Sequence, residues 1–152
     1  MKDIKRLVNQ FRHAIDMAKD EGDFNKDRSF SKFPSGCCDD TSDLLAEFLL
    51  RNGIRTYCVC GTYRDGSFEN HQSHAWLLYD NHIIIDITGD QFKYNSNFLN
   101  YDKSVYIEVE DDFHRLFEVE DRDIRKSVGL DALGSGSQPR LKELYRKIIK
   151  YI

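Results

Sequence analysis

The stretch that decides the fold is GCCDDTSDLL at residues 36–45, where two cysteines stand at the start of an apolar helical pattern. Leucine and phenylalanine recur at helical spacing as far as Arg51, and Asn52-Gly53 then supplies a left-handed stop, so a helix over about residues 38–51 is predicted. The first N–H groups of a helix lack intrahelical partners and carry partial positive charge. A cysteine placed there lies where both a thiolate and an oxyanion are stabilised.

A histidine and an aspartate follow in two strand-like runs. SHAW at residues 73–76 carries His74, and IIDIT at residues 84–88 carries Asp86 between isoleucines. A carboxylate among apolar strand neighbours is costly to bury unless it is paired. A cysteine, a histidine and an aspartate in this order can act as nucleophile, base and orienting group. Each residue alone has a common structural interpretation, such as a buried cysteine acting as a small apolar side chain, but the joint pattern is much rarer.

The remaining patterns frame these runs with helices at both ends and strands between them. Helices are expected over residues 4–18, 38–51, 111–118 and 121–128, and from Pro139 onward. Strands are expected over residues 54–62, 73–79, 82–88 and 104–109, with a hairpin at 80–81. Loops are expected over residues 21–36, 64–72 (with a tight turn at Asp65-Gly66) and 134–137. This order predicts an α+β fold in one domain spanning residues 1–152.

Composition narrows the function classes. The chain has 152 residues, 40% of them hydrophobic and 32% charged, which is typical of a globular domain with its own core. The net charge of −4 argues against nucleic acid or an anionic membrane as partner, because both require a basic face. No run approaches the roughly 20 apolar residues of a membrane span, and the first residues lack a signal-peptide core. We therefore expect a cytoplasmic protein with reduced thiols, although the sequence leaves open export as a folded effector.

The same residues resemble the transglutaminase-like superfamily. Residues 36–45 are similar to its glycine, any residue, nucleophilic cysteine and following aspartate that lead into a Leu-Leu helix. Residues 52–55 look like the turn after that helix, residues 73–76 like its histidine strand and residues 85–88 like its aspartate strand. The resemblance covers roughly residues 34–92. The doubled cysteine leaves the register open by one residue, and no proline follows the aspartate strand.

The resemblance implies a papain-like core in which the helix that carries the nucleophile packs on an antiparallel sheet, with extra N- and C-terminal helices. It implies Cys38 as nucleophile, His74 as base and Asp86 as orienting group, with no metal and no cofactor. The implied activity is hydrolysis of peptide or side-chain amide bonds through an acyl-enzyme, with a peptide or protein as substrate. The calcium sites of the much longer animal cross-linking enzymes do not carry over to this chain.

Two other residues are candidates for substrate or oxyanion contacts. Gln91 follows the aspartate strand and has an amide that can donate a hydrogen bond. Trp76 shares the His74 face of its strand and could shield the imidazole from water or simply fill the core. The loops at 21–36 and 63–72 are expected to flank the cleft. The acidic run 108–112 is expected to be a solvated strand end, and the remaining candidates in loops and turns are expected at the surface: His71, His82 and His114.

Three alternatives to a hydrolase stay open at this point. An acyl-enzyme on the same cysteine can be resolved by an amine, which would make the chain an acyltransferase. The chain can also keep the fold as a non-catalytic binding module. The third alternative is a zinc site, since thiols and imidazoles are the ligands that zinc accepts. The residues available for it are Cys38, Cys58, Cys60, His71 and His74.

Overall fold

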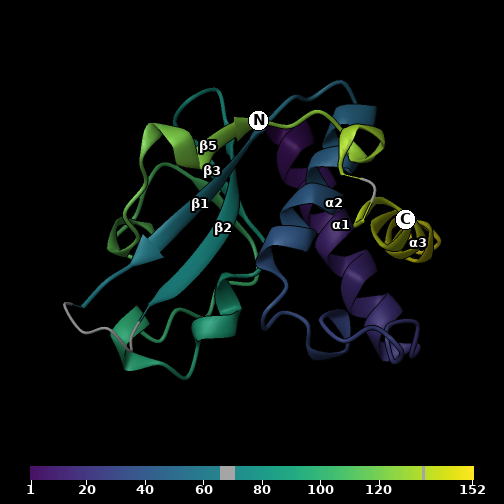
Figure 1. Cartoon of the computed structure of the whole chain (residues 1–152), viewed down its shortest axis with the longest axis horizontal. Coiled ribbons are helices and arrows are strands. Elements are labelled where there is room, and N and C mark those ends of the chain that lie inside the picture. The colour runs from purple at the N-terminus through teal and green to yellow at the C-terminus, as the bar shows by residue number, and fades with distance from the viewer. Residues whose placement is uncertain (66–70, 135) are drawn as a thin grey trace.

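The computed structural model describes residues 1–65, 71–134 and 136–152. Within these residues, three α-helices pack on a five-stranded antiparallel sheet, which confirms the predicted α+β class (Figure 1). The helices are α1 (Lys2–Asp20), α2 (Cys38–Arg51) and α3 (Gln138–Ile149). The strands are β1 (Tyr57–Tyr63), β2 (Gln72–Tyr79), β3 (Ile83–Asp86), β4 (Tyr106–Glu108) and β5 (Ile124–Lys126), in the sheet order β4-β3-β2-β1-β5.

The predicted hairpin between β2 and β3 sets the geometry of the polar site. Tyr79 pairs with Ile83, so three residues connect the strands, and the first two of them, Asp80 and Asn81, have positive φ, at 52° and 64°. The resulting register pairs Leu77 with Ile85 and Leu78 with Ile84. Because side chains alternate along a strand, this register directs His74 and Asp86 to the same face of the sheet, as diagonal neighbours within reach of each other.

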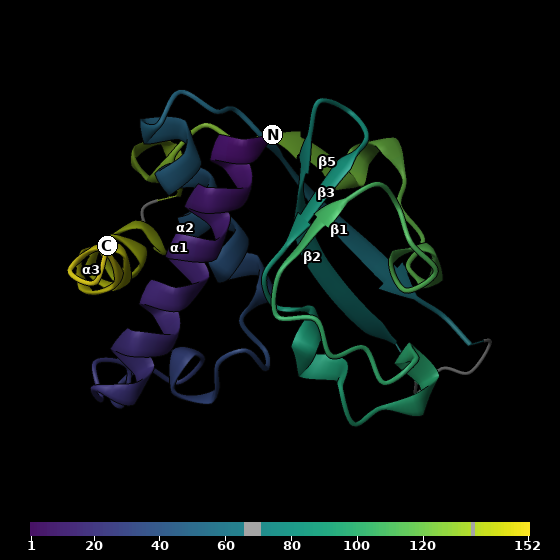
Figure 2. The same cartoon turned by 180° about the vertical axis from the view of Figure 1, so that it is seen from behind.

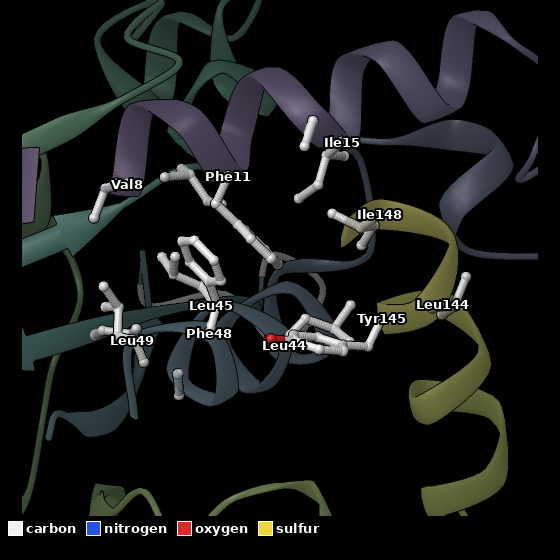
Figure 3. Close-up of a cluster of buried hydrophobic side chains, with 14 of the residues drawn as sticks. Val8, Phe11, Ile15, Leu44, Leu45, Phe48, Leu49, Leu144, Tyr145 and Ile148 are labelled. Carbon is white, nitrogen blue, oxygen red and sulfur yellow. The ribbon is translucent and has the colours of Figure 1, made fainter. Parts of the chain in front are cut away.

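The two faces of the sheet bury different kinds of side chain. On the helix face, aliphatic residues of β2 and β3 join one core with α1, α2 and α3, in which α2 packs on the sheet and α3 packs against α1 and α2. Val8, Phe11, Leu45 and Ile148 are among its buried residues (Figure 3). The opposite face is covered by the long segment that follows β3, and it is mainly aromatic. Figure 2 shows the helices gathered on one side of the sheet and much of this segment on the other. The polar site lies on the aromatic face.

Two of the predicted helices, over residues 111–118 and 121–128, do not form. Residues 111–118 form only a short 3-10 turn at His114–Leu116, and residues 121–128 contain a second 3-10 turn followed by β5. Strand β5 pairs antiparallel with β1, so hydrogen bonds to the free edge of β1 outweigh the weak helical pattern of this charged segment. The predicted tight turn at Asp65-Gly66 and the middle of the linker at 134–137 lie outside the described residues.

Candidate functional site

The start of α2 distinguishes the two adjacent cysteines. Cys37 is the N-cap residue, only 2% exposed, and its thiol donates to the Pro34 carbonyl at 3.5 Å. Burial raises the pKa of the Cys37 thiol to about 12. Cys38 is the first residue of the helix, is half-buried and lines a cavity of about 260 Å³. Both thiols line this cavity, and Cys38 is the more exposed of the two.

The cavity beside Cys38 combines the start of α2 with the start of β2 and the turn after β3. Its lining residues are Gly36, Cys37, Cys38, Asp39, Asp40, Gln72, Ser73 and Gln91. The N-cap side chain makes no capping hydrogen bond, so N–H groups in the first turn of α2 remain available to a ligand. The charged lining residues are two carboxylates, and one of them, Asp40, is paired with Arg140 at 2.7 Å. Gly36 and Gln72 come from the two loops that were expected to flank the cleft.

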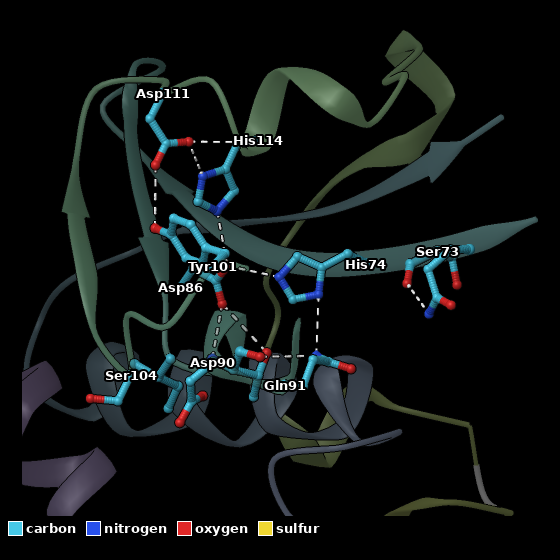
Figure 4. Close-up of polar contacts among 12 residues, drawn as sticks. Ser73, His74, Asp86, Asp90, Gln91, Tyr101, Ser104, Asp111 and His114 are labelled. Carbon is cyan, nitrogen blue, oxygen red and sulfur yellow. Dashed lines mark hydrogen bonds and ion pairs between the residues drawn. The ribbon is translucent and has the colours of Figure 1, made fainter. Parts of the chain in front are cut away.

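His74 lies on β2 with its side chain fully buried. Its Nε2 is 2.7 Å from Asp86 Oδ2, and its Nδ1 is 3.4 Å from the side-chain nitrogen of Gln91 (Figure 4). Burial acts to lower the pKa of His74, but the charge and hydrogen bond of Asp86 outweigh it, and Cys38 contributes in the same direction, so the pKa rises to about 9. A carboxylate accepts from Nε2–H, which leaves Nδ1 as the ring nitrogen that faces Gln91, a residue that lines the cavity.

Asp86 ends β3 and is 1% exposed. Its Oδ1 accepts from the backbone N–H of Thr88 at 2.9 Å, while Oδ2 faces two imidazoles, those of His74 and His114. Burial alone would raise the pKa of Asp86, but these two histidines hold it well below its usual range. Gly89 is required beside this carboxylate, because a Cβ there would lie 2.5 Å from the Tyr101 ring.

The sequence interpretation missed His114, which was expected at the surface but is 1% exposed. Its Nε2 lies 2.9 Å from Asp86 Oδ2 and its Nδ1 lies 2.6 Å from Asp111 Oδ1. Asp111 belongs to the run that was expected to be solvated, yet it also accepts from the Tyr101 hydroxyl at 3.2 Å. One sequence signal could have indicated that His114 is buried: it lies between Phe113 and Phe117, and both phenylalanines are buried on the same face of the sheet.

The other candidates occupy the surroundings of His74. The Gln91 amide nitrogen also donates to the Thr88 carbonyl at 3.0 Å, which fixes this side chain at the wall of the cavity. Trp76 is 4% exposed, with its ring centroid 5.7 Å from that of His74, so it packs in the aromatic core and covers one side of the imidazole. His71 and His82 are exposed, as expected.

The proposed zinc set is not brought together within the described residues. Cys58 is buried near Ser127 and Asp43, whereas Cys60 is exposed. One group there has the composition of a metal site, with the ligand atoms of His74, Asp86 and His114 within 4.8 Å of one another. All three are fully buried, and both imidazoles lie at hydrogen-bonding distance from one oxygen. The three side chains contact one another in a hydrogen-bond network that also includes Asp111, Thr88 and Gln91.

Comparison with known proteins gives no family or relative from which to interpret the site. No protein-family model, no curated protein and no solved structure matches the chain. In the part of the chain that the structure describes, no helix is both long and apolar enough to cross a membrane. The function must therefore be inferred from the thiol that lines the small cavity and from the buried imidazoles and carboxylate behind it.

Proposed function

We propose that this protein is a cysteine-dependent hydrolase of peptide or side-chain amide bonds, with Cys38 as nucleophile, His74 as acid and base, and Asp86 as orienting group. The observation that carries the proposal is the state of His74. Its imidazole is fully buried, bound through Nε2 to Asp86 at 2.7 Å, and has a pKa raised to about 9 by groups that include Cys38. An imidazolium held in this way can pair with a thiolate at the helix start.

In the first step, the Cys38 thiolate attacks the carbonyl carbon of the substrate amide, and the carbonyl electron pair moves to oxygen. The first-turn N–H groups of α2 and the Gln91 amide are the candidate donors to that oxyanion. As the intermediate collapses, the C–N bond breaks and the nitrogen takes a proton from His74 Nδ1–H. The products of this step are a free amine and a thioester on Cys38.

In the second step, the now neutral His74 accepts a proton at Nδ1 from a water molecule, which attacks the thioester. The C–S bond breaks, the carboxylic acid leaves, and the thiolate–imidazolium pair is restored. Asp86 remains ionised throughout, because it holds Nε2–H and stabilises the imidazolium without taking its proton. A primary amine in place of water would give acyl transfer with the same intermediate. We favour hydrolysis, because the cavity at Cys38 is small, at about 260 Å³.

The test is to trap the acyl-enzyme. The purified protein is mixed with an activated acyl ester, and intact mass spectrometry with peptide mapping locates the adduct. We expect one acyl group on Cys38 in the wild type and none there in Cys38→Ala. Cys60→Ser is the matched control, because it removes an exposed thiol outside the cavity and should acylate normally.

The fate of the thioester then distinguishes the alternatives. Graded concentrations of a primary amine are added to the trapped intermediate, and the acid and amide products are quantified. Predominant release of acid supports the hydrolase, whereas predominant amide at low amine concentration would assign acyl transfer instead. Failure of Cys38 to acylate with a broad panel of donors would refute both and favour a binding module with this fold.

A further inference from the structure

Two imidazoles converge on a single oxygen of Asp86, and the hydrolytic scheme uses only one of them. His74 Nε2 lies 2.7 Å and His114 Nε2 lies 2.9 Å from Asp86 Oδ2 (Figure 4). The ring centroids of the two histidines are 6.4 Å apart, so they approach the carboxylate from different sides. His114 comes from the segment that covers the aromatic face of the sheet and does not line the Cys38 cavity. Of the residues in the hydrolytic scheme, Asp86 is the one at hydrogen-bonding distance from His114.

The partners of His114 are carboxylates on both sides of its ring. Asp111 Oδ1 accepts from the His114 backbone N–H at 2.9 Å and faces His114 Nδ1 at 2.6 Å, while its Oδ2 accepts from the Tyr101 hydroxyl at 3.2 Å. On the other side, His114 Nε2 faces Asp86 Oδ2 at 2.9 Å, and Asp86 Oδ1 accepts from the Thr88 N–H. A hydrogen bond from His114 to each carboxylate requires an N–H on each ring nitrogen.

We propose that His114, hydrogen-bonded through its two ring nitrogens to Asp111 and Asp86, is a positioning residue that locks Asp86 Oδ2 onto His74. This inference rests on the proposed function, since positioning has a consequence only if His74 serves Cys38. Two N–H donors on one oxygen oppose rotation of the Asp86 carboxylate and keep it ionised despite complete burial. Asp111 Oδ1 lies 2.6 Å from the other ring nitrogen, Nδ1, and so fixes the orientation of the His114 imidazole.

The surroundings of His114 fit this role. The titratable groups that face its ring are the carboxylates of Asp86 and Asp111, the His74 imidazole, and the phenols of Tyr101 and Tyr106, with ring centroids 5.8 Å and 5.2 Å away. The indole of Trp76 contacts its other side, with centroids 5.0 Å apart. With the imidazole fully buried in this shell, its N–H protons are expected to exchange slowly with water.

The first experiment reads the protonation state directly, without reference to activity. Histidine is labelled with ¹⁵N in the wild-type protein, and long-range ¹H–¹⁵N spectra are recorded across the neutral pH range. We expect both nitrogens of His114 to show the chemical shifts of protonated imidazole nitrogens, together with slowly exchanging N–H protons at low field. Shifts of a neutral imidazole for His114 at neutral pH would overturn the proton assignment, and the inference with it.

The second experiment measures positioning through Cys38. The rate of Cys38 alkylation by iodoacetamide is recorded against pH for the wild type, His114→Phe and His114→Gln. Phenylalanine keeps the aromatic volume but removes the donor to Asp86, so we expect about tenfold slower alkylation near pH 7, equivalent to ~1.4 kcal/mol, and a rate profile displaced to higher pH. Glutamine can return an N–H donor to Asp86, so His114→Gln should stay within roughly threefold of the wild type.

The outcomes separate this inference from the proposed function. A role in packing alone would lower the unfolding midpoint of His114→Phe but leave its alkylation profile unchanged, and that result would refute positioning. If Cys38 in the wild type reacts no faster than Cys60, the hydrolase proposal fails, while the ¹⁵N spectra still report on the proton assignment. Should His114→Phe fail to fold, Asp111→Asn changes the partner of His114 Nδ1 instead. This variant must also displace the alkylation profile, or positioning is rejected.

Discussion

Replacing Asp86 by asparagine is the most informative perturbation, because it keeps the shape of the side chain and removes its charge. The native carboxylate accepts at both oxygens, from the Thr88 N–H on one side and from His74 and His114 on the other. An amide cannot accept on both sides. If its NH₂ faces the imidazoles, it forces His74 into the tautomer with the proton on Nδ1, which is the wrong nitrogen for a base that serves Cys38.

The size of the effect follows from the pKa of His74. Asp86 is the main group that overcomes burial and raises the pKa of His74 from 6.5 to about 9. At about 1.4 kcal/mol for each pKa unit, this corresponds to roughly 3 kcal/mol in favour of the imidazolium. Without the carboxylate charge, burial dominates and the pKa of His74 falls below 6.5. We therefore expect His74 to be neutral near pH 7 in Asp86→Asn, and Cys38 alkylation to slow at that pH.

The same change should alter how stability depends on pH. His74, whose pKa is raised on folding, contributes stability that is fully present below about pH 6.5 and is lost as the pH rises through 9. Asp86, whose pKa is lowered on folding, contributes stability that is present above about pH 4 and is lost as the pH falls further. In Asp86→Asn, a buried His74 with a lowered pKa instead costs stability as the pH falls through 6.5.

Urea denaturation at about pH 6, 7.5 and 9 measures this difference. The free energy of unfolding of the wild type should exceed that of Asp86→Asn most at about pH 6. This difference should be smaller by roughly 3 kcal/mol at about pH 9. Asp102→Asn, which neutralises an exposed carboxylate, is the control and should leave both the alkylation rate and the pH dependence unchanged. A folded Asp86→Asn with wild-type alkylation and a constant stability gap would remove Asp86 from the site.

Three further predictions follow from the same contacts. Near pH 7, iodoacetamide should label Cys38 first, and peptide mapping should find Cys37 unlabelled until the protein unfolds, because burial raises its pKa to about 12. Arg12→Met should cost about 3–5 kcal/mol in urea unfolding, because it leaves the buried partners of that guanidinium, which include Asp90 at 2.8 Å, without a donor. Gly89→Ala should cost about 1–3 kcal/mol by the same measurement, because the added Cβ would overlap the neighbouring tyrosine ring.

Each of these has an outcome that would contradict it. Equal labelling of all four cysteines would show that the start of α2 gives Cys38 no advantage. Arg6→Met removes an exposed arginine from the same helix and should leave the free energy of unfolding nearly unchanged. A similar loss of stability in Arg6→Met would show that the effect of Arg12→Met arises from the change in α1 and not from the contacts of Arg12. An unchanged unfolding midpoint for Gly89→Ala would mean that Tyr101 has room to move and does not hold the turn beside Asp86.

Local signals in the sequence determined the parts of the site that depend on neighbouring residues. Apolar spacing and the Asn52-Gly53 stop placed the helix that begins at Cys38, as the structure confirms. The turn at 80–81 and the alternation of its strands placed His74 and Asp86 on one hairpin, again as observed. These features are set within a few residues along the chain, so the interactions that create them are visible in the pattern itself.

Only the tertiary structure decided the rest. Burial separated Cys37 from Cys38, which share one local pattern, because Cys37 packs into the core between the helices and the sheet. His114 joined Asp86 because the covering segment folds back over the aromatic face, and its acidic neighbours gave it the character of a surface residue in the sequence. Strand β5 formed where the edge of β1 offered hydrogen bonds to a weakly patterned segment. In each case the deciding partner is distant in sequence, and local propensity carries no information about it.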